Sequence, residues 1–204
     1  APMDAPRTGV VDTVATRLTL HRLAGDVLEP EQQAANGEIA LEVTPHGFGT
    51  GHFRDGSGEL LRVRVEGREL VRERGDDETD RGAIEGPFDD AAAEILYAWW
   101  ALGEQVLASL DVAPGETVSP VTLWPEHFDI GATVSMGDSS VNLGCSPGDD
   151  FWPQPYVYAG PWQPQDGGFW NAPFGAFRSR ADIASAERAA AFLDEALALL
   201  RGGH

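Results

Sequence analysis

The chain has 204 residues, a formal net charge of −19 and 42% hydrophobic residues, so it can fill the core of one large domain. A charge of this size and sign repels phosphate polymers and anionic lipid surfaces, which argues against nucleic acid or a membrane as partner. Arginine supplies all 14 basic side chains, and none of them lies between Gly82 and Phe177.

The cellular compartment is constrained by what the sequence lacks. The single cysteine, Cys145, cannot form an internal disulfide, so no feature requires an oxidising compartment. No apolar run approaches the roughly 18 residues of a membrane span, and no signal-peptide pattern is present. We therefore expect a cytoplasmic protein, with the alternative that a leader preceding Ala1 has been removed.

A helix and a strand are expected near the start of the chain. Apolar residues recur with helical spacing from Asp12 to Leu28, and Pro30 marks the expected end of this helix. Residues 38–44 then alternate apolar with mostly charged side chains, which is typical of a half-buried strand. The Gly-rich run 45–51 is expected to form a turn.

A hairpin, a loop and two helices are expected in the rest of the chain. Apolar and charged residues alternate over 60–74, which predicts a hairpin, and the acidic run 75–86 is expected to be a solvated loop. Asp89 is a candidate N-cap for a long helix whose apolar stripe continues to Leu110 and supplies the centre of the core. A final helix is expected over 182–200.

A second hairpin is the most informative local pattern. Met136-Gly137-Asp138-Ser139 fits a type II′ turn with glycine in the first central position, and this turn fixes the register of both strands. The predicted opposite pairs are Ile130 with Cys145, Gly131 with Gly144, Asp129 with Ser146, and Thr133 with Asn142. One face is then apolar: Phe128, Ile130, Ala132, Val134, Met136, Val141, Leu143 and Cys145. The other is polar or small: His127, Asp129, Gly131, Thr133, Ser135, Ser140, Asn142, Gly144 and Ser146.

His127 and Asp129 are the candidate catalytic residues. Spaced two apart on one strand, they project from the polar face, where His127 can act as general acid or base and Asp129 can orient it. Glu126 projects to the other face unless the strand starts later. Cys145 falls on the apolar face, so we do not expect it to act as a nucleophile with His127. A purely structural hydrogen bond between His127 and Asp129 is an equal alternative.

The candidate ligand-binding residues surround this pair. A strand over 154–160 with Val157 toward the core places two tyrosines on the same polar face, and tryptophans follow on loops at its rim. The opposed Gly131 and Gly144 leave bare backbone that a flat group can approach, either from a ligand or from the protein itself. Aromatic side chains in a Pro-rich segment stack sugars or cations, or simply pack loops onto a sheet. The candidates are Asn142, Tyr156, Tyr158, Trp162 and Trp170.

A metal site is a minor alternative. His127 and Asp129, joined by Asp149 or Asp150, are reasonable ligands for a metal-dependent hydrolase. The sequence has no paired histidines with the spacing of a typical metal site, so we predict neither a metal nor a cofactor.

Several motifs resemble those of a family of uncharacterised actinobacterial proteins. The segments that carry the resemblance are Leu20-His21, Gly47–Thr50, Leu123–Asp129 (LWPEHFD), Ser146–Asp150 (SPGDD), Pro155–Trp162 (PYVYAGPW) and Phe169–Ala176 (FWNAPFGA). The resemblance covers most of the chain. It implies a bacterial source, and it brings no activity, substrate or catalytic residue.

These patterns predict an α+β fold: a single domain over residues 1–204 with a largely antiparallel sheet and three main helices. Residues 1–11 are a candidate disordered segment. We expect the helices to pack on one face of the sheet and the Trp-rich loops to lie at one end or over the other face.

Two functions from different classes are consistent with the sequence. The first is binding of a small polar molecule, or chemistry on it, in a pocket on the polar face of strands 127–146. The alternative is an acidic protein-interaction module without catalysis, a toxin-neutralising or regulatory partner that covers a basic protein.

Overall fold

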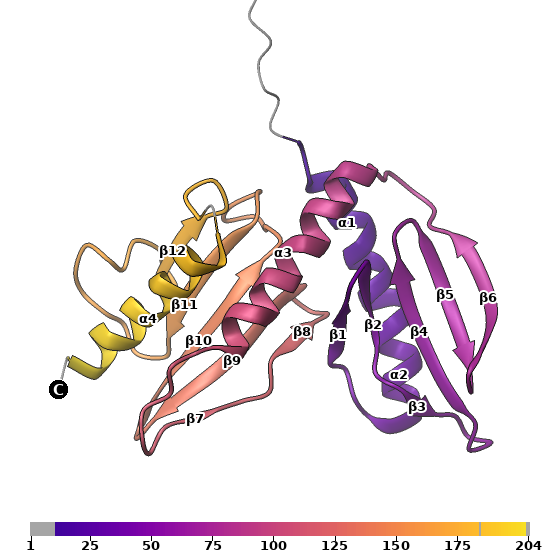
Figure 1. The fold of residues 1–204 in the computed structure, drawn as a ribbon, viewed down its shortest axis with the longest axis horizontal. Coiled ribbons are helices and arrows are strands. Elements are labelled where there is room, and N and C mark those ends of the chain that lie inside the picture. The colour runs from indigo at the N-terminus through magenta and orange to yellow at the C-terminus, as the bar shows by residue number, and fades with distance from the viewer. Residues whose placement is uncertain (1–10, 184, 203–204) are drawn as a thin grey trace, which may run out of the picture.

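The computed structural model describes residues 11–183 and 185–202. It shows an antiparallel sheet with three main helical segments, which confirms the predicted α+β fold (Figure 1). Residues 1–10, which make up most of the segment predicted as disordered, lie outside the described residues.

Two groups of six strands, β1–β6 and β7–β12, are separated by α3 and flanked by the N-terminal helical segments and α4. The helical segments are α1 (Val14–Leu23), the π-helical turn η1 (Ala24–Leu28), α2 (Glu29–Asn36), α3 (Asp90–Ala108) and α4 (Ala186–Gly202). The strands are β1 (Leu41–Thr44), β2 (Gly47–Thr50), β3 (Phe53–Arg54), β4 (Leu60–Glu66), β5 (Glu69–Arg74), β6 (Asp77–Ala83), β7 (Thr117–Val118), β8 (Thr122–Trp124), β9 (Asp129–Met136), β10 (Ser139–Ser146), β11 (Tyr156–Pro161) and β12 (Ala176–Ser179). Their order in the sheet is β12-β11-β10-β9-β8-β1-β2-β4-β5-β6, with β3 paired to β4 and β7 to β9.

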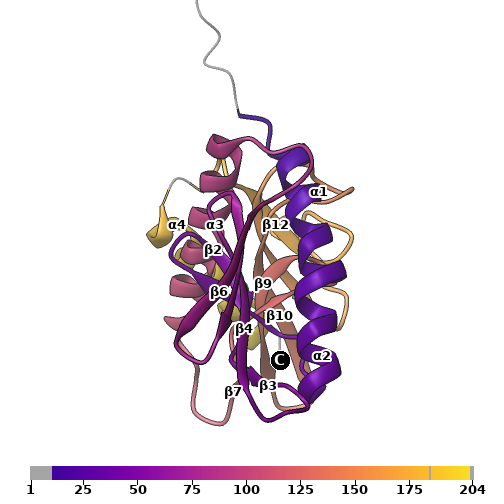
Figure 2. The same ribbon diagram turned by 90° about the vertical axis from the view of Figure 1, so that its right-hand side faces the viewer.

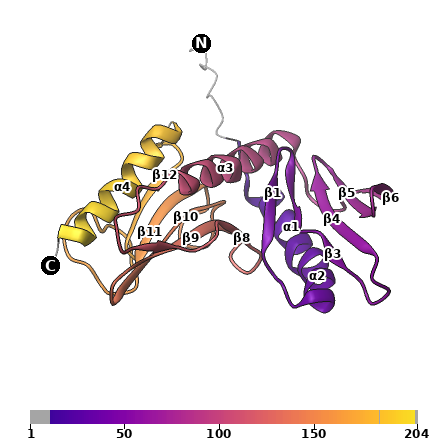
Figure 3. The ribbon, with the colours of Figure 1, turned by 60° about the horizontal axis from the view of Figure 1, so that its bottom comes forward.

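The helices lie on two sides of the sheet, not on one side as expected. Figure 2 shows α1 and α2 on one side and α3 and α4 on the other. The two halves of the sheet join through the pairing of β1 with β8 at Leu41 and Leu123. α3 runs across this junction and contacts β1, β9 and β10 (Figure 3). Within the described residues, none of the helices has both the length and the apolar character that crossing a membrane requires.

The first helix is longer than predicted. α1, η1 and α2 follow one another without a break from Val14 to Asn36. Pro30 was expected to end the helix, but it lies in α2, which directly follows the π-helical turn. The π-helical turn directly before it changes the hydrogen-bond register, so the helix continues past the proline. Gly37, with a φ of 81°, ends it in the left-handed conformation.

Two strands form where a turn and a loop were predicted. β2 lies within the Gly-rich run because glycine lets the backbone of β4 approach closely: a Cβ on Gly47 would lie 2.1 Å from the carbonyl oxygen of Val65. β6 is an edge strand whose residues are all exposed. Its Arg81 pairs with Glu69 of β5, and such cross-strand charge pairs stabilise an edge strand that has no apolar alternation to reveal it.

β9 and β10 pair in the predicted register, from Met136 opposite Ser139 to Ile130 opposite Cys145. Gly137 has a φ of 61°, as the predicted type II′ turn requires. The ladder ends at Ile130, so the predicted pair of Asp129 with Ser146 is not part of it. The apolar face is buried as predicted except for Met136, which is partly buried, and Cys145 is completely inaccessible.

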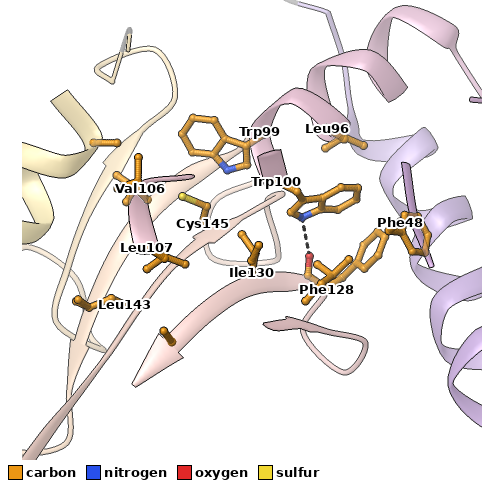
Figure 4. Close-up of a cluster of buried hydrophobic side chains, with 14 of the residues drawn as sticks. Phe48, Leu96, Trp99, Trp100, Val106, Leu107, Phe128, Ile130, Leu143 and Cys145 are labelled. Carbon is orange, nitrogen blue, oxygen red and sulfur yellow. Dashed lines mark hydrogen bonds between the residues drawn. The ribbon is translucent and has the colours of Figure 1, made fainter. Parts of the chain in front are cut away.

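α3 packs on this apolar face (Figure 4). Asp89 caps its first turn as predicted, accepting a hydrogen bond of 2.8 Å from a backbone N–H. Trp99 Nε1 donates to the carbonyl oxygen of Ser146 at 2.8 Å, and Trp100 Nε1 donates to that of Phe128 at 3.2 Å. These two bonds join α3 to the end of β10 and to the turn that precedes β9.

Gly103→Ala tests how closely α3 approaches the sheet. A Cβ on Gly103 would lie 2.5 Å from Cγ2 of Ile130 and 2.9 Å from Cβ of Cys145, so we expect a loss of about 1–3 kcal/mol of stability. Gly25→Ala is the matched control, because a Cβ there meets no atom within 4 Å. It should be neutral or stabilising by up to ~1 kcal/mol. Urea unfolding measures both, and equal effects would contradict the packing.

Candidate functional site

A groove with a volume of about 810 Å³ lies between α1 and the polar face of β9, β10 and β11. A smaller pocket of about 270 Å³ adjoins it at the turn between β8 and β9. The residues that line both are Glu126, His127, Asp129, Asn142 and Tyr158. The structure therefore brings both candidate catalytic residues to one cavity, on the side of the sheet that α3 and α4 do not cover (Figure 2).

His127 lies in a turn and not on a strand. β9 begins at Asp129, and Phe128 ends the turn with its backbone N–H bonded to the carbonyl oxygen of Trp124 at 2.7 Å. The prediction that His127 and Asp129 share one face of a strand is therefore wrong for His127. Because the strand starts late, Glu126 also borders the groove, which was the alternative for that residue.

The turn is held from both sides by helices. His21 of α1 donates its Nε2–H to the carbonyl oxygen of Pro125 at 2.7 Å, and its ring stacks on Phe128 with centroids 5.0 Å apart. Trp100 of α3 holds the carbonyl oxygen of Phe128. His21 was not predicted to be near the site, because nothing in the local sequence indicates a contact between residues so far apart along the chain.

Asp129 is bonded to Tyr158 and not to His127. The Tyr158 hydroxyl donates to Asp129 Oδ2, and no hydrogen bond between Asp129 and His127 is found in the described part of the chain. The ring of Tyr158 covers the bare backbone of the opposed glycines: a Cβ on Gly144 would lie 2.6 Å from its hydroxyl oxygen. The flat group expected there is thus an aromatic residue of the protein itself.

Burial determines the protonation of this pair. Asp129 is only 8% exposed, and burial raises the pKa of its carboxyl, while the hydrogen bond from Tyr158 and the electrostatic influence of nearby His127 lower it. Burial and the adjacent carboxylate also raise the pKa of the Tyr158 hydroxyl well above its ordinary value. The phenol therefore stays protonated and acts as the hydrogen-bond donor.

A second tyrosine and aspartate pair lies beside the first. The Tyr156 hydroxyl donates to Asp149 Oδ2 at 2.7 Å, and Asp149 Oδ1 accepts from the backbone N–H groups of Phe151 and Trp152 at 2.9 and 3.0 Å. The rings of Tyr156 and Tyr158 are 6.2 Å apart. Two acidic side chains are thereby oriented at the base of one groove.

Of the tryptophans predicted to bind a ligand, one lines the groove and one does not. Trp162 is 67% exposed at the rim, and its Nε1 donates to Asn142 Oδ1 at 3.1 Å. Thr133 donates to the same oxygen at 2.9 Å, so the Asn142 amide nitrogen is oriented as a donor for another group. Trp170 instead packs against the hydrophobic core beside Phe169.

Arg17 of α1 is a site residue that the sequence analysis missed. It is 8% exposed and lines the groove, and in the part of the chain that the structure describes its Nε has no hydrogen-bond acceptor. Burial lowers the pKa of its guanidinium, against the attraction of Asp149 and Asp150. The sequence does contain a sign of this role: Arg17 lies on the same helix face as the buried Leu20 and Ala24, where an apolar side chain is usual.

The arrangement is not that of a metal centre or a cysteine enzyme. In residues 11–183 and 185–202, no three His, Cys, Asp or Glu side chains are grouped so that they can hold a metal ion. The carboxylates of Asp129 and Asp149 are both engaged by tyrosine hydroxyls. Cys145 is buried beneath α3, where burial raises the pKa of its thiol, and this confirms that it does not face His127.

Comparison with known proteins does not add to this description. No protein-family model, curated protein or solved structure matches the chain. The resemblance to an actinobacterial family therefore stays a prediction, and the chemistry of the groove has to follow from the residues that line it.

Asp129→Asn tests the burial of the carboxyl. The raised pKa of Asp129 means that the folded protein binds this proton more tightly than the unfolded chain does. The free energy of unfolding therefore decreases as pH rises above about 4, the ordinary pKa of an aspartate in the unfolded chain. The asparagine variant lacks this loss, and its stability relative to wild type should increase from pH 4 to pH 7 in urea unfolding. Asp138→Asn, at the exposed hairpin tip, is the control. A relative stability of Asp129→Asn that falls with pH would contradict the assignment.

Proposed function

We propose that the protein binds a small polar molecule in the groove between α1 and strands β9 to β11. The observation that carries the proposal is the convergence of oriented polar groups on one cavity of about 810 Å³, a size typical of small-molecule sites. Asp129 and Asp149 are oriented by tyrosines, and the Asn142 amide is oriented by Thr133. A cytoplasmic location is part of this proposal.

Binding is better supported than catalysis. In the catalytic hypothesis Asp129 orients His127, but Asp129 is bonded to Tyr158 instead. His127 is exposed at the mouth of both pockets, where it can contact a ligand without any conformational change. Ligand binding requires only the groups that are already in place.

One observation favours the second candidate, an acidic interaction module. Apolar side chains are exposed beside the acidic groove, among them Trp162 at 67%, Leu18 at 49% and Phe151 at 41%. Exposed apolar groups next to carboxylates suit a basic protein partner. Binding of an arginine-rich peptide should then weaken steeply between low and high salt, and binding that is insensitive to salt would count against this function.

His127→Ala tests the proposed ligand site. Wild type and variant are compared in a thermal-shift screen of sugars, amines, metal ions and common metabolites. A ligand at about 100 times its Kd stabilises the wild type by roughly 2.7 kcal/mol, and this shift should be lost or strongly reduced in the variant. His46→Ala, an exposed histidine in the turn between β1 and β2, should respond like wild type. If no compound shifts any of the three proteins and His127→Ala is merely less stable, His127 has a structural role.

A further inference from the structure

Arg17 differs from the other arginines in the described part of the chain that approach carboxylates. Arg64, which is 18% exposed, lies 2.8 Å from Glu73, and Arg201, which is 30% exposed, lies 2.8 Å from Glu116. Arg17 is buried whereas Arg64 and Arg201 are half-buried, yet among the described residues no ion pair involves Arg17 and its Nε has no acceptor. A buried guanidinium without a bonded anion is unfavourable, because its lost hydration is not replaced.

The neighbouring carboxylates do not supply that anion. Asp149, the stronger source of attraction, already accepts three hydrogen bonds, one from Tyr156 and two from backbone N–H groups. Asp150 is exposed to solvent. Arg17 lines the cavity, and no described residue accepts a hydrogen bond from its guanidinium. The Nη groups, which are not among the atoms without solvent access, are therefore the donors available for an acceptor that enters from outside.

The charges of the rest of the groove limit what that acceptor can be. The carboxyl groups that line it belong to Glu126, Asp129, Asp149 and Asp150. Such a surface repels a phosphate dianion, whereas a single carboxylate that carries a cationic group elsewhere in the same molecule is attracted at both ends. Asp149 and Asp150 line the larger pocket together with Arg17, whereas Glu126 and Asp129 also line the smaller pocket. Two of the four carboxyl groups are therefore shared with a second pocket that Arg17 does not line.

We infer that the groove binds a small zwitterion of the amino-acid class, either free or as a short peptide. Its carboxylate pairs with Arg17, and its ammonium group lies near Glu126 and Asp129. The rings of Phe151 and Phe174, 5.1 Å apart and partly exposed, provide a surface for an apolar or aromatic side chain. This inference rests on the proposed function of the groove and specifies its ligand.

The test uses the full chain and has two steps: a screen for the best binder, and a comparison of that binder with its amide and its deaminated analogue. The 20 standard amino acids and the dipeptides of each with phenylalanine are screened by thermal shift, a set chosen for the ligand class. The best binder is then compared by calorimetry with its amide, which lacks the carboxylate, and with its deaminated analogue, which lacks the ammonium. Each analogue should bind roughly tenfold or more weakly than the parent.

Arg17→Gln should weaken binding of the parent zwitterion by roughly tenfold or more, and its affinity for the amide should be unchanged. Arg22→Gln is the matched control: it removes an arginine from the next turn of α1 that does not line the groove, and should leave affinity unchanged. Because Arg17→Gln removes a buried charge that no described residue pairs with, it should melt no lower than the unliganded wild type. If it fails to fold, Arg17→Lys replaces it, with weaker zwitterion binding expected from the loss of the planar fork.

The possible failures are distinguishable. If a neutral compound from the earlier screen binds and depends on His127 but no zwitterion does, the proposed function stands and the inference is wrong. Equal zwitterion binding by Arg17→Gln and wild type also overturns it. If no small molecule of either screen binds, the proposed function fails together with the inference.

Discussion

The turn from Pro125 to Phe128 is the constraint on which the site depends. Phe128 is fully buried and has a φ of 58°, a left-handed conformation that costs about 1–2 kcal/mol for a residue with a side chain. The cost is offset because His21 of α1 and Trp100 of α3 bond the carbonyl oxygens of the turn from opposite sides. The turn therefore joins the two helix layers, fixes where β9 begins, and brings His127 to the mouth of the groove.

The polar groups of the groove make folding less favourable. Burial destabilises the ionised carboxyl of Asp129, and it also destabilises the guanidinium of Arg17, which has no ion-pair partner among the described residues. Apolar residues at both positions would fold with less penalty. Local departures from good packing that gather at one place are typical of functional sites, and here they gather in a cavity that opens to solvent.

Elements that are fixed by interactions between residues close in the sequence could be predicted, and elements that are fixed by contacts between distant residues could not. The β9–β10 register follows from one glycine turn and the alternation of nearby residues, so it was predicted correctly down to Ile130 opposite Cys145. β2 and β6 were missed, since one depends on close contact between the glycines of β2 and the β4 backbone, and the other on charge pairs across strands. Of the ligand-binding candidates, Trp170 does not reach the groove, because a rim loop can place its aromatic residues on either side of the sheet.

The sequence by itself determined the fold class, the apolar and polar faces of β9 and β10, the N-cap of α3 and the exclusion of Cys145 from the site. These depend on period, turn chemistry and capping, which act within a few residues. Only the tertiary structure decided that His127 lies in a turn, that Tyr158 takes the carboxyl of Asp129, and that Arg17 and His21 face the same groove. These contacts join residues of α1, the turn and β11 that lie far apart along the chain, so packing alone brings them together.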